Sequence, residues 1–368
     1  MLSPNLAESK EKELRVVAIG GGTGLSTLLR GLKRYVATPD RRRGIRIGGA
    51  AAPQAPAPVP SPSLRCVVRE LSAVVTVTDD GGSSGRLRVD LKILPPGDIR
   101  NCMVALSEDE HLLSQLFQFR FEQGDLEGHS FGNLFVAALS RITGDFAQAV
   151  QMSSQILAAR GKIYPSTNAN VRLAAEMDDG SVVRGETNIT ASKRSIVELR
   201  LEPATADPLP ETLEAIANAD LITLGPGSLY TSLITNLLVR GIPEALAASR
   251  ATKVFVCNLM TQANESLGLT ASEHIEKIVQ HAAVGAGSPI FDYALINTGP
   301  ISAERLEQYA REGQEPIEAD LKRIRALGVE PITGDFVHEG EVLRHDYDRL
   351  AERVLTLGLE RLAPVPVQ

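Results

Sequence analysis

Residues 16–32, VVAIGGGTGLSTLLRGL, constrain the fold more than any other segment, because an apolar run leads through consecutive glycines into a helical pattern. The apolar run favours a strand, and leucines that recur every three or four residues after the glycines favour a helix. The loop matches neither standard phosphate-binding motif. Leu25 stands where a dinucleotide motif has its third glycine, and no Lys followed by Ser or Thr completes a P-loop. We predict a strand–loop–helix unit that holds an anion with backbone N–H groups; a tight turn that binds nothing is the alternative.

The same arrangement recurs later in the chain. ADLITLGPGSLYTSLITNLLV contains an apolar run, a glycine loop at residues 225–228 and a helical pattern, while TKVFVCNLMTQ and DYALINTGP run into Asn258 and Asn297. Strands that alternate with helices indicate a mostly parallel, doubly wound α/β sheet with ligands at the carboxyl ends of its strands. We expect Ser228 to cap a helix or to contact the ligand. The two asparagines suit a base edge or an N-acetyl group, or ordinary turns.

Composition narrows the possible partners. The 38 Lys and Arg residues against 45 Asp and Glu residues give a net charge of -7, and aromatic residues make up only 4% of the chain, with no Trp. These values argue against a nucleic-acid partner. The three cysteines form no C-x-x-C pair, so we predict neither a zinc site nor a redox motif. The polar start and the lack of a long apolar run predict a cytoplasmic protein with no membrane span.

A proline-rich segment interrupts the first half of the chain. GGAAAPQAPAPVPSPS, residues 48–63, cannot support a helix or a central strand, and we expect an exposed linker rather than a partner-binding tail. Without this insertion about 22 residues separate Gly24 from Asp79, close to the spacing of the ribose-binding acid in dinucleotide folds. The predicted organisation is a polar tail at 1–14, an α/β domain at 15–360 with the Pro/Ala-rich insertion at 38–70 and a small β subregion at 160–200, and a second tail at 361–368.

The small β subregion is predicted from a hairpin pattern. VRLAAEMDDGSVVRGET, residues 171–187, has two alternating arms around Asp179 and Gly180, a pair that is typical of a tight turn between antiparallel strands. We expect this hairpin to lie beside the main sheet.

The segment TVTDDGGSSGRLR, residues 76–88, carries the densest polar chemistry. Asp79 and Asp80 follow an apolar strand, and a glycine-rich run that we expect to be flexible brings the hydroxyls of Ser83 and Ser84 and the cation of Arg86. Two carboxylates beside a diphosphate would repel it by about 1–4 kcal/mol per charge pair at 4 Å. Either Mg²⁺ held by the two aspartates offsets this repulsion, or they bind sugar hydroxyls while an arginine takes the phosphate. A solvated Asx turn is the alternative without a ligand.

Two further loops supply candidate side chains. In PPGDIRNCMVALS we predict Asp98 first as a helix N-cap, with Arg100 and Asn101 able to face the crevice. In GHSFGNLFVAALSRI a glycine loop opens a helix, and His129 is a candidate general base or phosphate donor, or a packing histidine. Asn133 of the same motif joins the candidate ligand-binding residues.

The motifs AIGGGTGLSTLLRGLK, VTVTDDGGSSGRLR, PPGDIRN, GHSFGNL, YPST, LGPGSLYTS, CNLMTQ and RHD, in this order, resemble the bacterial gluconeogenesis-factor proteins, which are related to 2-phospho-L-lactate transferase. The resemblance extends from Arg15 to about Leu359 and omits the insertion. It implies a Rossmann-like three-layer α/β/α fold and binding of a UDP-sugar, UDP-N-acetylglucosamine in particular. It further implies a regulatory role in cell-wall precursor supply and cell shape during gluconeogenic growth, through contact with a partner enzyme. We also expect a homo-oligomer.

By the same resemblance, Tyr309 in LEQYAREG and Arg344 in VLRHD bind the UDP-sugar. The candidate catalytic residues are Asp79, Asp80 and His129, and the first two are the candidate Mg²⁺ ligands. The complete set of candidate ligand-binding residues is Gly21, Gly22, Thr23, Gly24, Asp79, Asp80, Ser83, Ser84, Arg86, Asn133, Gly225, Gly227, Ser228, Asn258, Tyr309 and Arg344.

Three functional hypotheses remain open from the sequence. The first is a nucleotide-sugar sensor without turnover, and the second is a Mg²⁺-dependent transferase that moves a phospholactyl-type group, as its relatives do. The third, a dinucleotide-dependent oxidoreductase, is weakened by Leu25.

Overall fold

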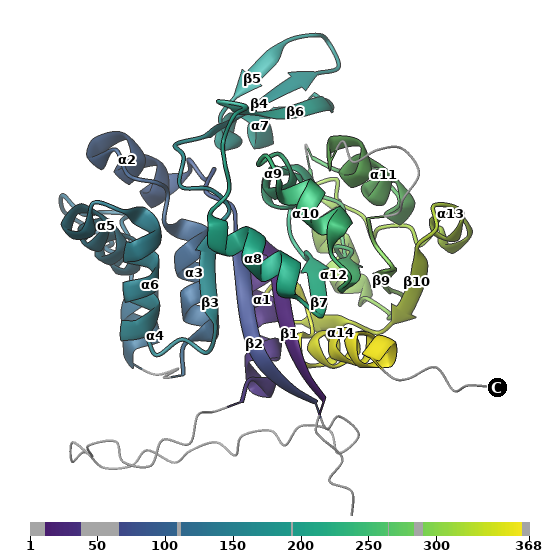
Figure 1. Cartoon of the computed structure of the whole chain (residues 1–368). Helices are drawn as coiled ribbons and strands as arrows, with labels where there is room; N and C mark the ends of the chain where they lie inside the picture. Colours follow the sequence, from purple (N-terminus) through teal and green to yellow (C-terminus); the bar gives the residue numbers. More distant parts are fainter. Residues whose placement is uncertain are drawn as a thin grey trace, which may run out of the picture.

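A seven-stranded parallel sheet forms the centre of the molecule (Figure 1). The computed structural model describes residues 12–37, 66–108, 112–192, 194–263, 265–282 and 290–362. The strand order is β10-β9-β8-β7-β1-β2-β3, and every neighbouring pair is parallel. The strands are β1 (Lys12–Gly20), β2 (Cys66–Val75), β3 (Lys162–Pro165), β7 (Leu221–Leu224), β8 (Thr252–Val256), β9 (Tyr293–Asn297) and β10 (Glu330–Gly334).

The strand order places a reversal of the chain between β1 and β7. The first half of the chain builds outward from β1 through β2 to β3, and the chain then returns to β7 on the other side of β1 and builds outward to β10. In doubly wound sheets such a reversal opens a crevice at the carboxyl ends of the two strands. The predicted doubly wound, three-layer fold is confirmed, and the glycine loops after β1 and β7 are neighbours.

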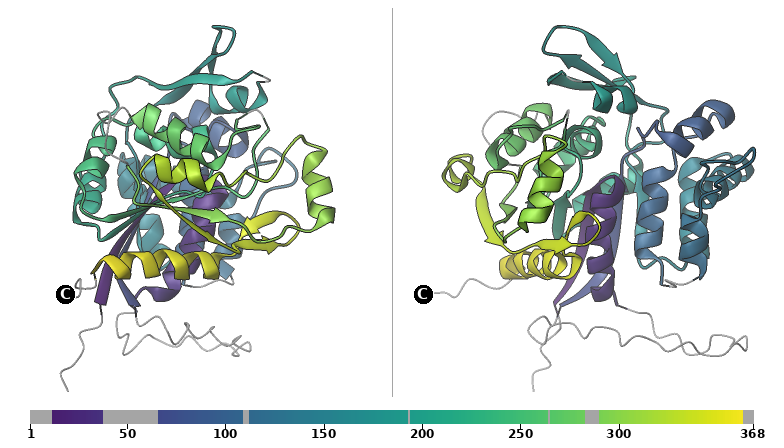
Figure 2. Two further views of the ribbon diagram at one scale, coloured as in Figure 1. Left: turned by 90° about the vertical axis from the view of Figure 1, so that its right-hand side faces the viewer. Right: turned by 180° about the vertical axis from the view of Figure 1, so that it is seen from behind.

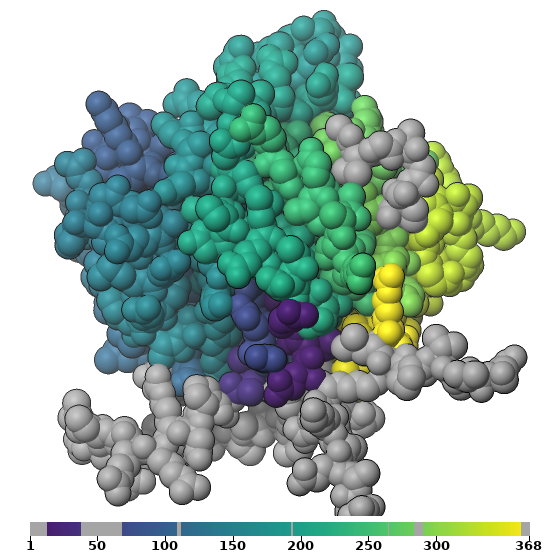
Figure 3. Space-filling model, viewed as in Figure 1, coloured from purple at the N-terminus to yellow at the C-terminus, as the bar shows by residue number. Residues whose placement is uncertain are grey.

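Helices cover both faces of the sheet. Seen from behind, α1 (Gly22–Leu32, purple) and α14 (Tyr347–Leu362, yellow) lie on one face (Figure 2). On the other face α8 (Pro210–Asn218) and α10 (Ile242–Ala248) lie in front of the strands (Figure 1). In the space-filling view from the same side, residues of β1 and β2 are visible only below these two helices (Figure 3). The leucines predicted on one face of α1 are fully buried.

Further helices complete the layers. Within the described residues they are α2 (Gly82–Leu91), α3 (Gly97–Leu106), α4 (Leu112–Gln118), α5 (Phe131–Thr143), α6 (Phe146–Ile156), α7 (Glu186–Ala191), α9 (Thr235–Leu237), α11 (Ala271–Ala282), α12 (Ala303–Ala310) and α13 (Leu321–Ala326), with a 3-10 turn η1 (Lys33–Tyr35) and a π-helix η2 (Leu229–Ile234). None of the helices described has the length and apolar content needed to cross a membrane.

A small antiparallel sheet stands above the carboxyl edge of the main sheet (Figure 1). It consists of β4 (Arg172–Met177), β5 (Val182–Arg184) and β6 (Ile196–Glu202), in the order β5-β4-β6. The predicted hairpin is the β4–β5 pair, and Gly180 takes a φ of +78° in its turn. β3, however, joins the main sheet, so the antiparallel region begins later than the predicted residue 160.

The boundaries of the main domain also differ from the prediction. β1 begins at Lys12, inside the predicted tail, and β2 begins at Cys66, so residues 66–70 belong to the sheet rather than to the insertion. Lys12 pairs with Cys66, because ladder hydrogen bonds use the backbone and tolerate polar side chains near strand ends. α14 likewise continues to Leu362, beyond the predicted start of the second tail. The rest of the insertion, 38–65, and the outer parts of both tails lie outside the described residues.

A second, two-stranded antiparallel sheet joins β11 (Val337–Glu339) to β12 (Leu343–His345). It follows β10 and precedes α14 in the chain. β12 contains the predicted ligand residue Arg344 and is therefore central to the site.

Candidate functional site

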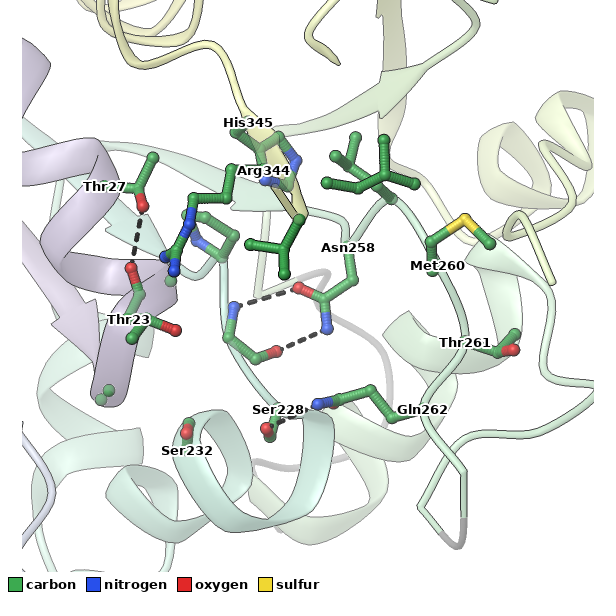
Figure 4. A pocket seen from close by; sticks show the side chains of 18 of the residues that line it. Thr23, Thr27, Ser228, Ser232, Asn258, Met260, Thr261, Gln262, Arg344 and His345 are labelled. Atoms are coloured by element: carbon green, nitrogen blue, oxygen red, sulfur yellow. Dashed lines mark hydrogen bonds between the residues drawn. The ribbon is translucent and has the colours of Figure 1, made fainter. Parts of the chain in front are cut away.

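A cavity of about 530 Å³ opens at the carboxyl ends of β1 and β7. Its walls are the two glycine loops, the segment after β8 and the β12 strand (Figure 4). This volume lies within the range of small-molecule sites. Of the predicted residues, the following line it: Gly21, Gly22, Thr23, Gly24, Gly227, Ser228, Asn258, Tyr309 and Arg344.

The first glycine loop packs too tightly for side chains. Gly22 has a φ of +60°, and its N–H donates to the Asp98 carboxylate. A Cβ on Gly21 would lie 2.7 Å from Oδ2 of Asp98, and one on Gly24 would lie 2.4 Å from the carbonyl oxygen of Pro226 in the second loop. The prediction of Asp98 as an N-cap is therefore wrong: Pro96 takes the N-cap position of α3, and the carboxylate instead binds the loop at the N-terminus of α1.

Asn258 holds the second glycine loop in place. Its Oδ1 accepts from Gly227 N–H at 3.1 Å, and its Nδ2 donates to the Gly227 carbonyl at 2.8 Å (Figure 4). Ser228 precedes η2 but makes no capping bond; its Oγ accepts from Nε2 of Gln262 at 2.9 Å. Ser228 therefore holds the N-cap position of η2 without a side-chain capping bond, and it lines the cavity; Asn258 and Gln262, which follow β8, fix this loop.

Buried hydrogen bonds hold the segments next to both glycine loops in place. The Glu265 carboxylate accepts from Tyr230 N–H at 3.3 Å and from the Thr231 hydroxyl at 3.1 Å at the start of η2, although burial raises the pKa of Glu265. Asn236 donates to the Gly20 carbonyl at 3.0 Å. A displacement of either loop would therefore break buried hydrogen bonds.

The third wall depends on Tyr309 and His345. The Tyr309 hydroxyl accepts from Leu343 N–H at 3.0 Å, and this bond connects α12 to the residue before Arg344. His345 is buried, and burial lowers its pKa to about 4. The imidazole is therefore neutral at pH 7, and its Nε2–H donates to the Cys257 carbonyl at 3.1 Å. The exposed Arg344 side chain lies beside the first glycine loop (Figure 4).

Asp79 and Asp80 bind backbone groups instead of lining the cavity. Asp79 Oδ1 accepts from Gly81 N–H at 2.9 Å in an Asx turn. Asp80 Oδ1 accepts from both the N–H and the hydroxyl of Thr187, at 2.8 and 2.7 Å, and so anchors α7 below the small sheet. Among the described residues no group of three or more His, Cys, Asp or Glu side chains is arranged to hold a metal ion.

The predicted residues of α2 and α5 contact one another and are not part of the cavity lining. Ser83 and Ser84 are buried in the first turn of α2, so the predicted flexible run is helical. Ser83 Oγ lies 3.1 Å from Nδ1 of His129, and Nδ2 of Asn133 donates to Ser84 Oγ at 3.5 Å. Arg86 donates at 2.6 Å to a main-chain carbonyl of the loop before α5. None of these residues lines the cavity.

Two residues that were predicted at strand ends, Gly225 and Asn297, form or stabilise turns. Gly225 takes a φ of +92°, and a Cβ there would lie 2.7 Å from the Val256 carbonyl oxygen. Asn297 Oδ1 accepts from Phe336 N–H at 2.9 Å, and Nδ2 donates to the Gly299 carbonyl at 3.1 Å. Asn297 therefore holds a turn, the second of the two roles predicted for it.

Among the residues that the structure describes, the acids that line the cavity are Asp98 and Glu186. Part of Asp98 faces the cavity, but protein surrounds the carboxyl group, and burial, followed by the charge of Asp79, raises its pKa to about 7. Burial, followed by Asp98 and Asp79, raises the pKa of Glu186 to about 9. Glu186 is the first residue of α7, which lies between β5 and β6 in the chain, and no sequence motif pointed to it. An anion beside these groups requires their protonation or a cation.

Comparison with known proteins identifies the family. The family model described as 2-phospho-L-lactate transferase CofD matches residues 16–337. The chain belongs to the CofD family. It is 46% identical over 346 residues to the gluconeogenesis factor of Halalkalibacterium halodurans, covering 94% of this chain and 96% of that protein. The gluconeogenesis factor of Bacillus subtilis is 44% identical and is covered to 98%.

A solved structure supports the fold of this CofD-family member. The crystal structure of a UPF0052-family protein from Bacillus halodurans superposes with a TM-score of 0.82 at 45% identity, covering 94% of this chain and 99% of that one. The predicted relationship to the gluconeogenesis-factor proteins and to the CofD family is therefore confirmed.

Proposed function

We propose that this CofD-family protein is a gluconeogenesis factor that binds a UDP-sugar, UDP-N-acetylglucosamine in particular, as a regulator of cell-wall precursor supply and cell shape. One observation carries the proposal: two glycine loops from adjacent strands meet at one cavity, with Tyr309 and Arg344 on its opposite wall. The names of the relatives support the gluconeogenic context. A partner enzyme of cell-wall precursor synthesis would bind this protein in its ligand-bound state.

The cavity offers groups suited to each part of such a ligand. Arg344 supplies a permanent positive charge for a phosphate, and Arg is well suited to this because its guanidinium donates two parallel hydrogen bonds. Asn101 and Gln262 bring amide groups that can donate to and accept from the uracil or the N-acetyl group. Carboxyl groups on the remaining wall accept hydrogen bonds from sugar hydroxyls.

A transferase of the 2-phospho-L-lactate type is the second candidate. The family description and the carboxyl groups beside the first glycine loop favour it, because Mg²⁺ held there would neutralise a bound phosphate. Asp98 lines the cavity, and Asp79 lies close enough for its charge to raise the pKa of Asp98, so these two suit this role better than Asp80. In such an enzyme Asp79→Asn would abolish turnover.

Thermal-shift and calorimetric titration with UDP-N-acetylglucosamine, each with and without Mg²⁺, tests the proposal. A ligand at 100 times its Kd stabilises the folded state by about 2.7 kcal/mol. We expect a saturable shift and no nucleotide release from the ligand. The absence of a shift at millimolar concentration contradicts nucleotide-sugar binding. Nucleoside-phosphate release from an activated phospholactyl donor, lost in Asp79→Asn, would instead establish the transferase.

A further inference from the structure

A second cavity of about 480 Å³ adjoins the first on the side of α1. The two cavities share Thr23, Thr27, Asn101, Arg344 and His345. In Figure 4 Arg344 lies beside Thr23 and Thr27, two of the residues that line both cavities. The second cavity extends from the first glycine loop along α1 and α3. We name it the arginine cavity, because Arg30, Arg100, Arg120 and Arg344 line it.

The arginine cavity is lined by positively charged side chains and, among the described residues, by no acidic ones. Four guanidinium groups line it, with Arg30 from α1, Arg100 from α3, Arg120 from the segment after α4 and Arg344 from β12. No Asp or Glu is among the described residues that line it. Guanidinium groups stay protonated in proteins, so this charge does not depend on pH. The main cavity differs, because two carboxyl groups line it.

Most of this positive charge has no neutralising partner. Within the part of the chain that the structure describes, the side chains of Arg30 and Arg344 make no hydrogen bond or ion pair. Arg100 donates to the Ser130 hydroxyl and to Asn101 Oδ1, each at 2.8 Å, while its buried Nε has no partner among the described residues. Arg120 donates only to a main-chain carbonyl, at 2.5 Å.

The arrangement carries an electrostatic cost that a bound anion would relieve. Burial, followed by the charge of Arg120, lowers the pKa of Arg100, and the charges of Asp98 and Asp79 offset only part of this effect. Elsewhere arginines pair with acids: Arg15 lies 2.9 Å from Asp220, and Arg323 lies 2.9 Å from Glu276. Like charges gathered in a concave site are typical of anion recognition, because an anion there interacts with several of them at once.

We propose that the arginine cavity is a second anion subsite, which binds a phosphate group through Arg30, Arg100 and Arg120. The phosphate comes either from the diphosphate of the ligand in the main cavity or from a separate phosphorylated molecule bound beside it. Both sources present the same chemistry to the arginines. The assignment does not depend on which nucleotide the main cavity holds.

The test uses inorganic pyrophosphate and the full-length protein in calorimetric titration at fixed ionic strength. We expect saturable binding that weakens about tenfold in Arg30→Gln and in Arg120→Gln, because a charge-assisted hydrogen bond is lost in each. Arg30 makes no contact that folding requires, so its variant should fold normally. Arg141→Gln on α5 is the matched control, because Arg141 is exposed and does not line the arginine cavity; its affinity should not change.

A competition experiment separates the two sources of the phosphate. If saturating UDP-N-acetylglucosamine displaces pyrophosphate, the diphosphate of the nucleotide occupies the subsite; if both bind together, a separate phosphorylated molecule does. Either result supports the subsite. Failure of pyrophosphate to bind at millimolar concentration, or equal affinity in wild type, Arg30→Gln and Arg120→Gln, overturns it. Pyrophosphate binding that depends on Arg30 without nucleotide-sugar binding would refute the proposed function and leave the subsite in place.

Discussion

Replacement of Gly24 by alanine tests whether the two glycine loops form one unit. A Cβ at this position would lie 2.4 Å from the Pro226 carbonyl oxygen and 2.9 Å from Gly227 Cα, where ordinary contact begins near 3.4 Å. Both neighbours are backbone atoms, so the loops must separate by about 1 Å. Overpacking of this kind costs about 1–3 kcal/mol. A helical Gly→Ala change gains about 1 kcal/mol in helix propensity, so the expected net loss of unfolding free energy is about 0–2 kcal/mol.

The measurement is urea unfolding together with titration of UDP-N-acetylglucosamine. Gly24→Ala should lower the urea midpoint without changing the slope, and should weaken nucleotide-sugar binding. The control is Gly358→Ala in α14, where the new Cβ meets only leucine side chains, the nearest being Leu221 Cδ2 at 3.1 Å, and stability should change little. A Gly24→Ala protein that is about 1 kcal/mol more stable than wild type, as in an exposed helix, would refute contact between the loops.

Three further predictions concern the walls of the site. Because burial raises the pKa of Glu186 to about 9, the folded state keeps a proton that the unfolded chain loses, so the unfolding free energy falls as pH rises from about 4.5 to 9. Glu186→Gln should flatten this slope in urea midpoints measured across that range; an unchanged slope contradicts the assignment. Tyr309→Phe removes the acceptor for Leu343 N–H and should weaken UDP-N-acetylglucosamine binding about threefold to tenfold by calorimetry; unchanged affinity would exclude this contact from the site. Thr187→Val removes one donor to Asp80 and should lower the opening free energy of α7 by about 0.5–1 kcal/mol in hydrogen exchange; unaltered protection would show that the hydroxyl does not anchor α7.

The sequence predicted the features of the site that depend on local backbone conformation. Gly22, Gly225 and Gly180 all adopt positive φ, at +60°, +92° and +78°, and each lies in a loop or turn that the sequence pattern located. Glycine is favoured at such positions because a Cβ would be strained there. Short-range patterns of this kind need no knowledge of the strand order.

The sequence could not predict which strand ends share the crevice. β2 lies on the opposite side of β1 from β7, so Asp80 and Arg86, which follow β2, end outside the cavity, whereas Asn258, which follows β8, lines it. Only the strand order of the folded sheet, which reverses between β1 and β7, distinguishes the residues that line the cavity from those that do not. Glu186 enters the cavity from α7, far from either glycine loop in the chain, and a single glutamate carries no motif that would reveal it.

The two cavities together imply a direction for the bound ligand. Asp98 and Glu186 line the main cavity and are absent from the described lining of the arginine cavity. A diphosphate placed toward the arginines gains attraction, and the hydroxyls of the attached sugar then face the carboxyl groups of Asp98 and Glu186, whose oxygens can accept hydrogen bonds. The opposite orientation would place the phosphates beside carboxyl groups, which offer no positive charge, and leave the arginines without a counter-ion. Charge alone therefore favours one orientation of a nucleotide sugar, with its phosphates beside α1 and its neutral hydroxyls below the small sheet.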